Sequence, residues 1–246
     1  MRFIISPAKK MNMTPDILNY EGYPEFVEDA DILCRYISAL SYGEAKALWK
    51  CNDKIAEQNF ERFQKMNLRQ NLTPALMAYE GIQYQYMAPS IMEDSALAYL
   101  QEHLRILSGF YGLLKPLDGV VPYRLEMQAK AEVNGSKNLY EFWGKRLAER
   151  LFEESKVIIN LASKEYSKCI SMYLTPEVRW ITCVFGEYNG DKVIEKGTLA
   201  KMARGEMVRF MAERQAEAPE EMQKFDRLGY RFASEISDEG QYIFLK

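Results

Sequence analysis

Histidine and cysteine are scarce in this chain of 246 residues, which has one histidine, His103, and four cysteines. The cysteines Cys34, Cys51, Cys169 and Cys183 lie far apart and form no Cys-x-x-Cys pair. Structural zinc sites and disulfide frameworks need closely spaced or paired ligands, so neither is expected here. A single histidine in an apolar helical stretch cannot supply a multi-histidine iron site, and a structural role is favoured for it. We therefore predict reduced thiols, no metal site and no cofactor.

Long apolar runs and an excess of cations are also missing. No stretch approaches the roughly 18 apolar residues that a membrane helix needs, and the N-terminus lacks the pattern of a signal peptide. Lysine and arginine number 32 against 35 aspartates and glutamates, for a net charge of −3. This balance excludes a uniformly cationic nucleic-acid coat, although it allows a local basic groove. The expected location is cytoplasmic, with no membrane partner.

Repeats, low-complexity tracts and long linkers are absent as well, which predicts one domain over residues 1–246. Apolar runs at 2–6, 104–107 and 157–163 are typical of buried strands, whereas residues 24–103 carry apolar side chains at helical spacing. Thr73 and Pro74 match a helix N-cap followed by proline at the first helical position. The predicted fold class is mixed α/β (α+β), with a central mixed sheet and a helical insertion.

The C-terminal half predicts a hairpin, a long helix and a closing pair of strands. Asn189-Gly190 separates two strand-like stretches and suits a type I′ turn. A helix is expected from about residue 198 to 215. On one side of this helix the residues are apolar, and the opposite side carries the three cations Lys201, Arg204 and Arg209. Such a face either lies along a phosphate backbone or is simply solvated.

Small polar residues end three of the predicted strands: Ser6, Ser108, and Asn160 with Ser163. Open α/β sheets bind ligands beyond the carboxyl ends of their strands, so neighbouring strands would bring these side chains and Lys9 to one crevice. The alternative is that they only end strands and cap helices.

The stretch 107–127 is rich in glycine and proline and predicts a rigid, irregular loop, a common place for a site. Lys115 and Arg124 could bind phosphate, and the rings of Tyr111 and Tyr123 could stack on an unpaired base. Glu126 is the candidate catalytic group. It would be either an acid or base in a dry pocket or one half of a structural ion pair with Arg124.

Several of these motifs together resemble the YaaA family of bacterial peroxide-stress resistance proteins. The resemblance covers essentially the whole chain, in order, and rests on the segments 5–9 (Ile-Ser-Pro-Ala-Lys), 107–118 (Leu-Ser-Gly-Phe-Tyr-Gly-Leu-Leu-Lys-Pro-Leu-Asp), 122–127 (Pro-Tyr-Arg-Leu-Glu-Met), 139–143 (Leu-Tyr-Glu-Phe-Trp), 159–163 (Ile-Asn-Leu-Ala-Ser) and 203–205 (Ala-Arg-Gly).

The resemblance implies a cytoplasmic protein that limits oxidative damage under hydrogen peroxide, linked to lowered free iron. It also implies an unusual single-domain fold with a basic cleft that binds duplex or locally opened DNA. A helix-hairpin-helix element would correspond to Leu48–Phe63, yet this stretch contains no glycine. The family's glycine-dependent phosphate contact is therefore in question at this position.

Two functions remain open at this point. The first is a DNA-binding stress protein whose contacts are Lys9, Lys10, Tyr111, Lys115, Tyr123, Arg124, Lys201, Arg204 and Arg209. The alternative is an enzyme that cleaves or transfers a glycosidic bond of a nucleobase or nucleotide in the same cleft, using Ser6, Ser108, Asn160, Ser163 and Glu126. The sequence leaves the oligomeric state open, a monomer included.

Overall fold

The computed structural model describes residues 1–13 and 18–246. Its main sheet has the strand order β11-β12-β9-β8-β1-β5-β6, and β10 pairs with β9. The strands are β1 (Arg2–Ile5), β5 (Leu104–Ser108), β6 (Gly112–Leu114), β8 (Val157–Asn160), β9 (Arg179–Asn189), β10 (Lys192–Ile194), β11 (Arg231–Phe232) and β12 (Gln241–Leu245). The central strands β5, β1, β8, β9 and β12 are parallel, and β6, β10 and β11 are antiparallel to their neighbours. The mixed α/β fold class is thus confirmed.

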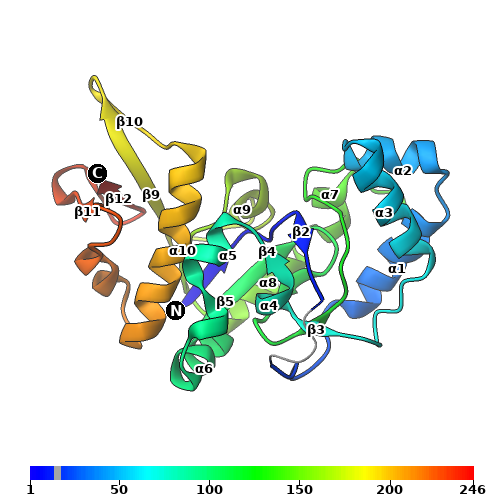
Figure 1. The fold of residues 1–246 in the computed structure, drawn as a ribbon. Coiled ribbons are helices and arrows are strands. Elements are labelled where there is room, and N and C mark those ends of the chain that lie inside the picture. The colour runs from blue at the N-terminus through cyan, green and yellow to red at the C-terminus, as the bar shows by residue number, and fades with distance from the viewer. Residues whose placement is uncertain (14–17) are drawn as a thin grey trace.

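Helices surround this sheet and extend to one side of it (Figure 1). They are α1 (Val27–Ser38), α2 (Tyr42–Trp49), α3 (Asp53–Gln64), α4 (Ala75–Ala78), α5 (Ile82–Met87), α6 (Asp94–His103), α7 (Leu139–Trp143), α8 (Arg146–Glu154), α9 (Lys164–Ser171) and α10 (Gly197–Arg214). Short 3-10 helices are η1 (Pro89–Ile91), η2 (Pro219–Lys224) and η3 (Ser234–Ile236). In Figure 1, α1–α3 form one end of the molecule, and the β9–β10 hairpin with β11 and β12 forms the other, with α10 beside them.

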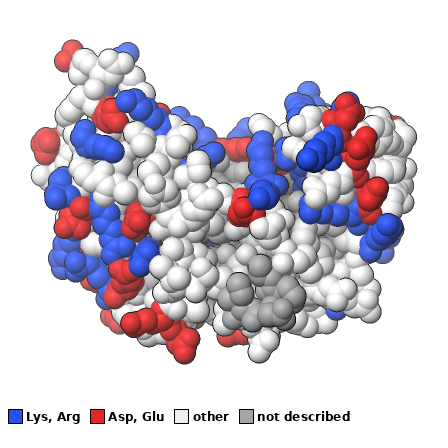
Figure 2. Space-filling model, in the orientation of Figure 1, with Lys and Arg blue, Asp and Glu red and all other residues white. Residues whose placement is uncertain are grey.

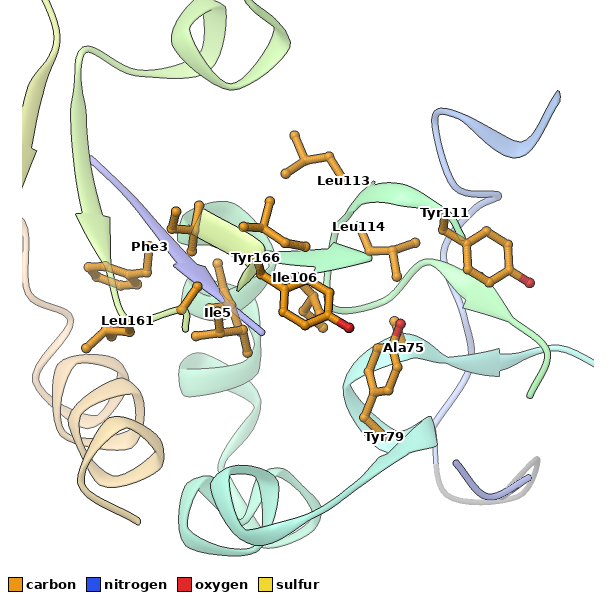
Figure 3. Close-up of a cluster of buried hydrophobic side chains, with 14 of the residues drawn as sticks. Phe3, Ile5, Ala75, Tyr79, Ile106, Tyr111, Leu113, Leu114, Leu161 and Tyr166 are labelled. Atoms are coloured by element: carbon orange, nitrogen blue, oxygen red, sulfur yellow. The ribbon is translucent and has the colours of Figure 1, made fainter. Parts of the chain in front are cut away.

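The central strands are buried on both faces, which explains their continuous apolar sequences. Phe3, Ile4 and Ile5 of β1 are fully buried, and Ile106 of β5 and Ile159 of β8 lie beside them in the core. Figure 3 shows Phe3, Ile5 and Ile106 within one layer of side chains. The hydrophobic core also takes in Trp49, Phe63 and Phe244 and so joins both ends of the molecule.

The expected elements of the C-terminal half are confirmed. β9 and β10 form an antiparallel hairpin across Asn189-Gly190, where Gly190 has a positive φ of 61°. The helix expected at 198–215 is α10, and the closing strands are β11 and β12.

The expectation for Thr73 and Pro74 was wrong in detail. These two residues form β3, which pairs with β7 (Gly119–Val120), and the short helix α4 begins one residue later, with Pro74 as its N-cap. Pairing with a distant strand therefore overrode the local capping pattern. A similar two-stranded ribbon joins β2 (Lys10–Met11) to β4 (Tyr79–Glu80).

The region Leu48–Phe63 forms a helical hairpin despite its lack of glycine. Lys50 caps the C-terminus of α2 in the left-handed conformation, with φ of 47°, where a glycine is usual. Asn52 then starts α3 by accepting a hydrogen bond from the Ile55 N–H at 3.0 Å. The turn is therefore built by αL and N-cap residues. At this turn the side chain of Lys50 occupies the position where a glycine would leave the backbone accessible.

Candidate functional site

A cavity of about 530 Å³ lies beyond the carboxyl ends of β1 and β8. Its lining comes from the segment after β1, from β2, β4 and α5, and from the start of α9 and α10. In Figure 2 the surface is hollowed between the β9–β10 hairpin with α10 on one side and the α1–α3 end on the other, with Lys and Arg side chains on both sides. We call this cavity and its surroundings the cleft.

Two of the predicted polar residues meet in the cleft, because β1 and β8 are parallel neighbours in the sheet. The Ser6 Oγ accepts a hydrogen bond from the Ser163 N–H at 2.9 Å and donates to the Ser163 Oγ at 3.2 Å. The Tyr84 hydroxyl donates to the Ser6 carbonyl oxygen at 3.0 Å. The convergence expected for the strand ends is therefore seen for Ser6 and Ser163.

Ser108 and Asn160 do not line the cleft; both are buried and shape the chain after their strands. The Asn160 Oδ1 accepts from the Ala162 N–H at 3.0 Å. The Ser108 Oγ accepts from the N–H groups of Phe110 and Tyr111, at 3.1 and 2.9 Å. For these two residues the structure matches the alternative reading, in which they end strands and build turns.

A directed chain of hydroxyl groups starts at Ser108. Because both lone pairs of the Ser108 Oγ are used, its proton must be donated to the Tyr123 hydroxyl, 2.6 Å away. Tyr123 then donates to the Tyr79 hydroxyl at 2.7 Å. Burial raises the pKa of Tyr123 to about 12 and that of Tyr79 well above its ordinary value. These phenols therefore stay neutral and act as fixed hydrogen-bonding groups.

The two rings predicted to stack on a base lie in the core instead. Tyr111 is fully buried and Tyr123 is 5% exposed; Figure 3 shows Tyr111 among the buried side chains. The Tyr123 ring stacks on Phe110, with centroids 4.9 Å apart. The Tyr111 hydroxyl accepts from the Val121 N–H at 3.2 Å. Neither ring is accessible to a base in this conformation, because both rings are packed in the core.

Three lysines bring exposed positive charge to the cleft: Lys9, Lys10 and Lys201. The Lys9 Nζ lies 3.3 Å from Glu126, and the Lys10 Nζ lies 2.7 Å from Glu80. Both lysines are about two-thirds exposed, so these pairs are weak and exchangeable. Phosphate oxygens could replace the carboxylates at small cost.

Arg124 and Arg204 are held more firmly than these lysines. The Arg124 side chain is 11% exposed and bonds Glu126 at 2.9 Å, and the Arg204 side chain is 14% exposed and bonds Glu195 at 3.2 Å. Both partners are buried in the Arg124–Glu126 pair, which makes it costly to separate, whereas in the other pair only Arg204 is withdrawn from the surface. We interpret these arginines as supports of the cleft wall.

The basic face expected on α10 is divided by the packing of this helix. Buried residues point in several directions, since α10 packs against both α5 and β9. Lys201 and Arg204 line the cleft, whereas Arg209 does not and bonds Glu213 at 2.7 Å. Lys115 is also away from the cleft, in a small cavity with Asp118 and Arg105. The sequence predicted that these cations would contact DNA together. Tertiary packing instead places Arg209 and Lys115 away from the cleft.

Two carboxylates flank Lys9 in the cleft. Glu126 is 8% exposed and pairs with Arg124 and Lys9, which is the ion-pair geometry of the two considered for it. Glu165, near the start of α9, was not predicted. Burial chiefly, and the nearby charge of Glu126 in addition, raise the pKa of Glu165, although its side chain accepts from the Gln128 N–H at 3.3 Å. Its place two residues after Ser163, in the turn from strand to helix, was the available signal.

Some sequence expectations concern sites away from the cleft. His103 stacks on Tyr99, and its Nδ1 lies 3.0 Å from the Met1 carbonyl oxygen, as expected for a structural histidine. All four cysteines are free thiols, as predicted. Within residues 1–13 and 18–246, no cluster of three or more His, Cys, Asp or Glu side chains is arranged to hold a metal ion. No described helix is both long and apolar enough to cross a membrane.

Comparison with known proteins identifies the family of this chain. A family model described as "Peroxide stress protein YaaA" matches residues 1–236. The chain belongs to the YaaA family. A UPF0246 protein of Lachnoclostridium phytofermentans is 58% identical over 100% of this chain and 96% of its own length. One from Agathobacter rectalis is 57% identical, over 99% and 98%, and one from Pediococcus pentosaceus is 48% identical, over 100% and 98%.

The family assignment confirms the resemblance that the motifs indicated. Of the YaaA-like segments, 5–9 and 159–163 contribute Ser6 and Ser163 to the cleft, and 203–205 contributes Arg204. The segments 107–118 and 122–127 supply the buried hydroxyl chain and the ion pair behind it. The segments that carry the resemblance thus build the cleft and its support.

Proposed function

We propose that this protein acts in the cytoplasm during peroxide stress by binding DNA, duplex or locally opened, in the cleft. The observation that carries the proposal is the gathering of Lys9 and Lys10, from the segment after β1, and of Lys201, from the distant helix α10, around one cavity. Cations placed along a groove contact phosphates without reading sequence. Membership of a family of peroxide stress proteins supports the stress role.

Protection of DNA would then follow from occupancy. A protein that covers an opened stretch excludes small oxidants from the bases, and the same binding holds the strand for repair. The link to lowered free iron is part of this proposal through the family resemblance. No iron site among the described residues supports it directly.

The experiment measures binding of labelled duplex and bubble DNA by fluorescence anisotropy over a salt series. The Lys9→Ala, Lys10→Ala, Lys201→Ala triple variant should bind more weakly, with a log K against log salt slope that is shallower by about 0.9 for each lost duplex contact. The matched control replaces Lys137, Lys156 and Lys224, three exposed lysines that do not line the cleft, and removes the same net charge. Equal weakening in both variants would contradict the proposal.

A second candidate is an enzyme acting on a nucleobase or nucleotide, favoured by Glu165 and Glu126 beside Lys9. A half-buried carboxyl group with a raised pKa is a suitable proton donor to a leaving base. Base-processing enzymes extrude their target into a pocket, which suits the cavity volume. Chromatography of the same DNA reactions for released base separates the two candidates: a pure binding protein releases none.

A further inference from the structure

A second cavity, of about 490 Å³, lies at the C-terminal end of α3 and the following turn. Its other wall is formed by Val121 and Pro122, directly before the segment Tyr123–Glu126 that backs the cleft. A volume of several hundred Å³ is typical of small-molecule sites. None of the contacts proposed above for DNA uses this cavity.

Arg62 gives this cavity its chemistry. Its side chain is partly buried, and burial lowers its pKa with no offsetting contribution from a carboxylate. Over residues 1–13 and 18–246, the Arg62 side chain has neither an ion pair nor a hydrogen bond. The carbonyl end of α3 favours a cation in its last turn, but an exposed side chain would satisfy that preference. Among the described residues, Arg62 is thus a half-buried guanidinium that is available to bind an anion.

The rest of the lining matches a phosphorylated ligand with a flat polar group. Lys65, one turn beyond Arg62 and exposed, adds a second cation. Carboxamides surround this pair, at Gln58, Asn67, Gln70 and Asn71. Side chains of this type donate and accept hydrogen bonds at once, as the edge of a nucleobase requires. Met66 and Pro122 add an apolar wall.

Glu61 also lines this cavity, and its carboxylate forms no ion pair with Arg62. The negative charge of Glu61 repels an anion, so a bound phosphate is expected on the Arg62 side of the cavity. The planar fork of arginine bonds two phosphate oxygens at once, which a lysine cannot do.

We propose that this cavity is a nucleotide site, in which Arg62 and Lys65 bind the phosphate and the carboxamides bind the base. The ligand is either a free mononucleotide or the terminal nucleotide of a DNA strand, since both present the same phosphate and base. The site does not depend on DNA binding in the cleft.

Isothermal titration calorimetry with AMP tests the site, with adenosine and inorganic phosphate as partial ligands. AMP should bind to the wild type, and Arg62→Ala should weaken this binding about tenfold or more, with a smaller loss for Arg62→Lys. Lys54→Ala, an exposed lysine on the same helix outside the cavity, is the matched control and should bind AMP like the wild type. Helix content by circular dichroism verifies that each variant is folded.

Different outcomes of this experiment test the site itself and identify the source of its ligand. Adenosine binding as tightly as AMP, or unchanged AMP binding by Arg62→Ala, would overturn the site. A 5′-phosphorylated oligonucleotide that binds more tightly than its unphosphorylated form, through Arg62, identifies a strand end as the source; AMP binding alone identifies a free nucleotide. The Lys9, Lys10 and Lys201 triple variant should retain AMP binding, so failure of the cleft proposal leaves this one standing.

Discussion

Similar charged residues have opposite environments on two sides of the main sheet. We call the side where β1, β5 and β8 begin the amino edge, and the side where these strands end the carboxyl edge. At the amino edge, the Arg105 and Glu154 side chains are 3% and 7% exposed and lie 2.6 Å apart, and the Arg2 Nε donates to the same carboxylate at 2.9 Å. At the carboxyl edge, Lys9 and Lys10 are about two-thirds exposed and pair with Glu126, which is buried, and with Glu80, which is partly exposed.

This difference teaches which charges are available to a ligand. Burial alone would raise the pKa of Glu154, yet Arg105 and Arg2 hold it below its ordinary value, so the carboxylate stays charged in the core. If these arginines moved to bind a ligand, the Glu154 carboxylate would remain buried without a counter-charge. The lysines of the cleft can exchange one anion for another in water. A basic residue is therefore a candidate contact only where its own charged group is exposed to water.

The largest effect should come from breaking the amino edge. Glu154→Gln leaves Arg105 buried without a counter-charge and removes one of the two carboxylates that pair with Arg2, and should lower the free energy of unfolding by about 3–5 kcal/mol. Urea denaturation measures the loss. Glu102→Gln removes the exposed partner of the same Arg2 and should cost less than about 1 kcal/mol. Similar losses for the two variants would remove the distinction between the edges.

An intermediate effect should come from the support of the cleft wall. A Cβ at Gly205 of α10 would lie 2.1 Å from the Gln83 carbonyl oxygen of α5, so Gly205→Ala must force the two helices apart. We expect a loss of about 1–3 kcal/mol in thermal or urea unfolding, with weaker DNA binding because Lys201 moves with α10.

The matched control for this variant is Gly43→Ala in α2, where the added methyl group meets nothing within 4 Å. There the substitution should stabilise the protein by about 0.5–1 kcal/mol, because alanine favours the helix. A stable Gly205→Ala protein would show that the wall between α5 and α10 is not tightly packed.

The last effect builds up gradually with pH and concerns Asp118, near the amino edge. Burial raises the pKa of Asp118 to about 7, while its side chain accepts from the Lys115 N–H at 2.8 Å. Because this value exceeds the ordinary pKa of about 4, the folded protein retains a proton that the unfolded chain has lost. Stability should therefore fall between about pH 4 and 7, by at most about 1.4 kcal/mol per pH unit from this group.

Asp118→Asn keeps the hydrogen-bond acceptor and removes the titration. Denaturant midpoints from pH 4 to 8 should then lack that part of the slope, with the difference from the wild type largest above pH 7. Parallel pH profiles for the two proteins would show that Asp118 titrates normally in the folded state.

The sequence by itself determined the elements of the fold and several members of the site. Apolar runs such as Phe3–Ile5 and the turn at Asn189-Gly190 are local signals, because backbone preference and alternation act over a few residues. The polar ends of β1 and β8 predicted that Ser6 and Ser163 would meet if the two strands were neighbours, since parallel strands end at one edge of a sheet.

Only the tertiary structure decided which side chains are available there. Tyr111 and Tyr123 look like exposed loop rings in sequence, but contacts with distant elements bury them. Arg209 shares a helix face with Lys201, yet its ion pair and the packing of α10 separate it from the cleft. Glu165 comes close to Glu126 although they are distant in sequence. Burial and ion pairing depend on long-range packing, and a local pattern contains no measure of either.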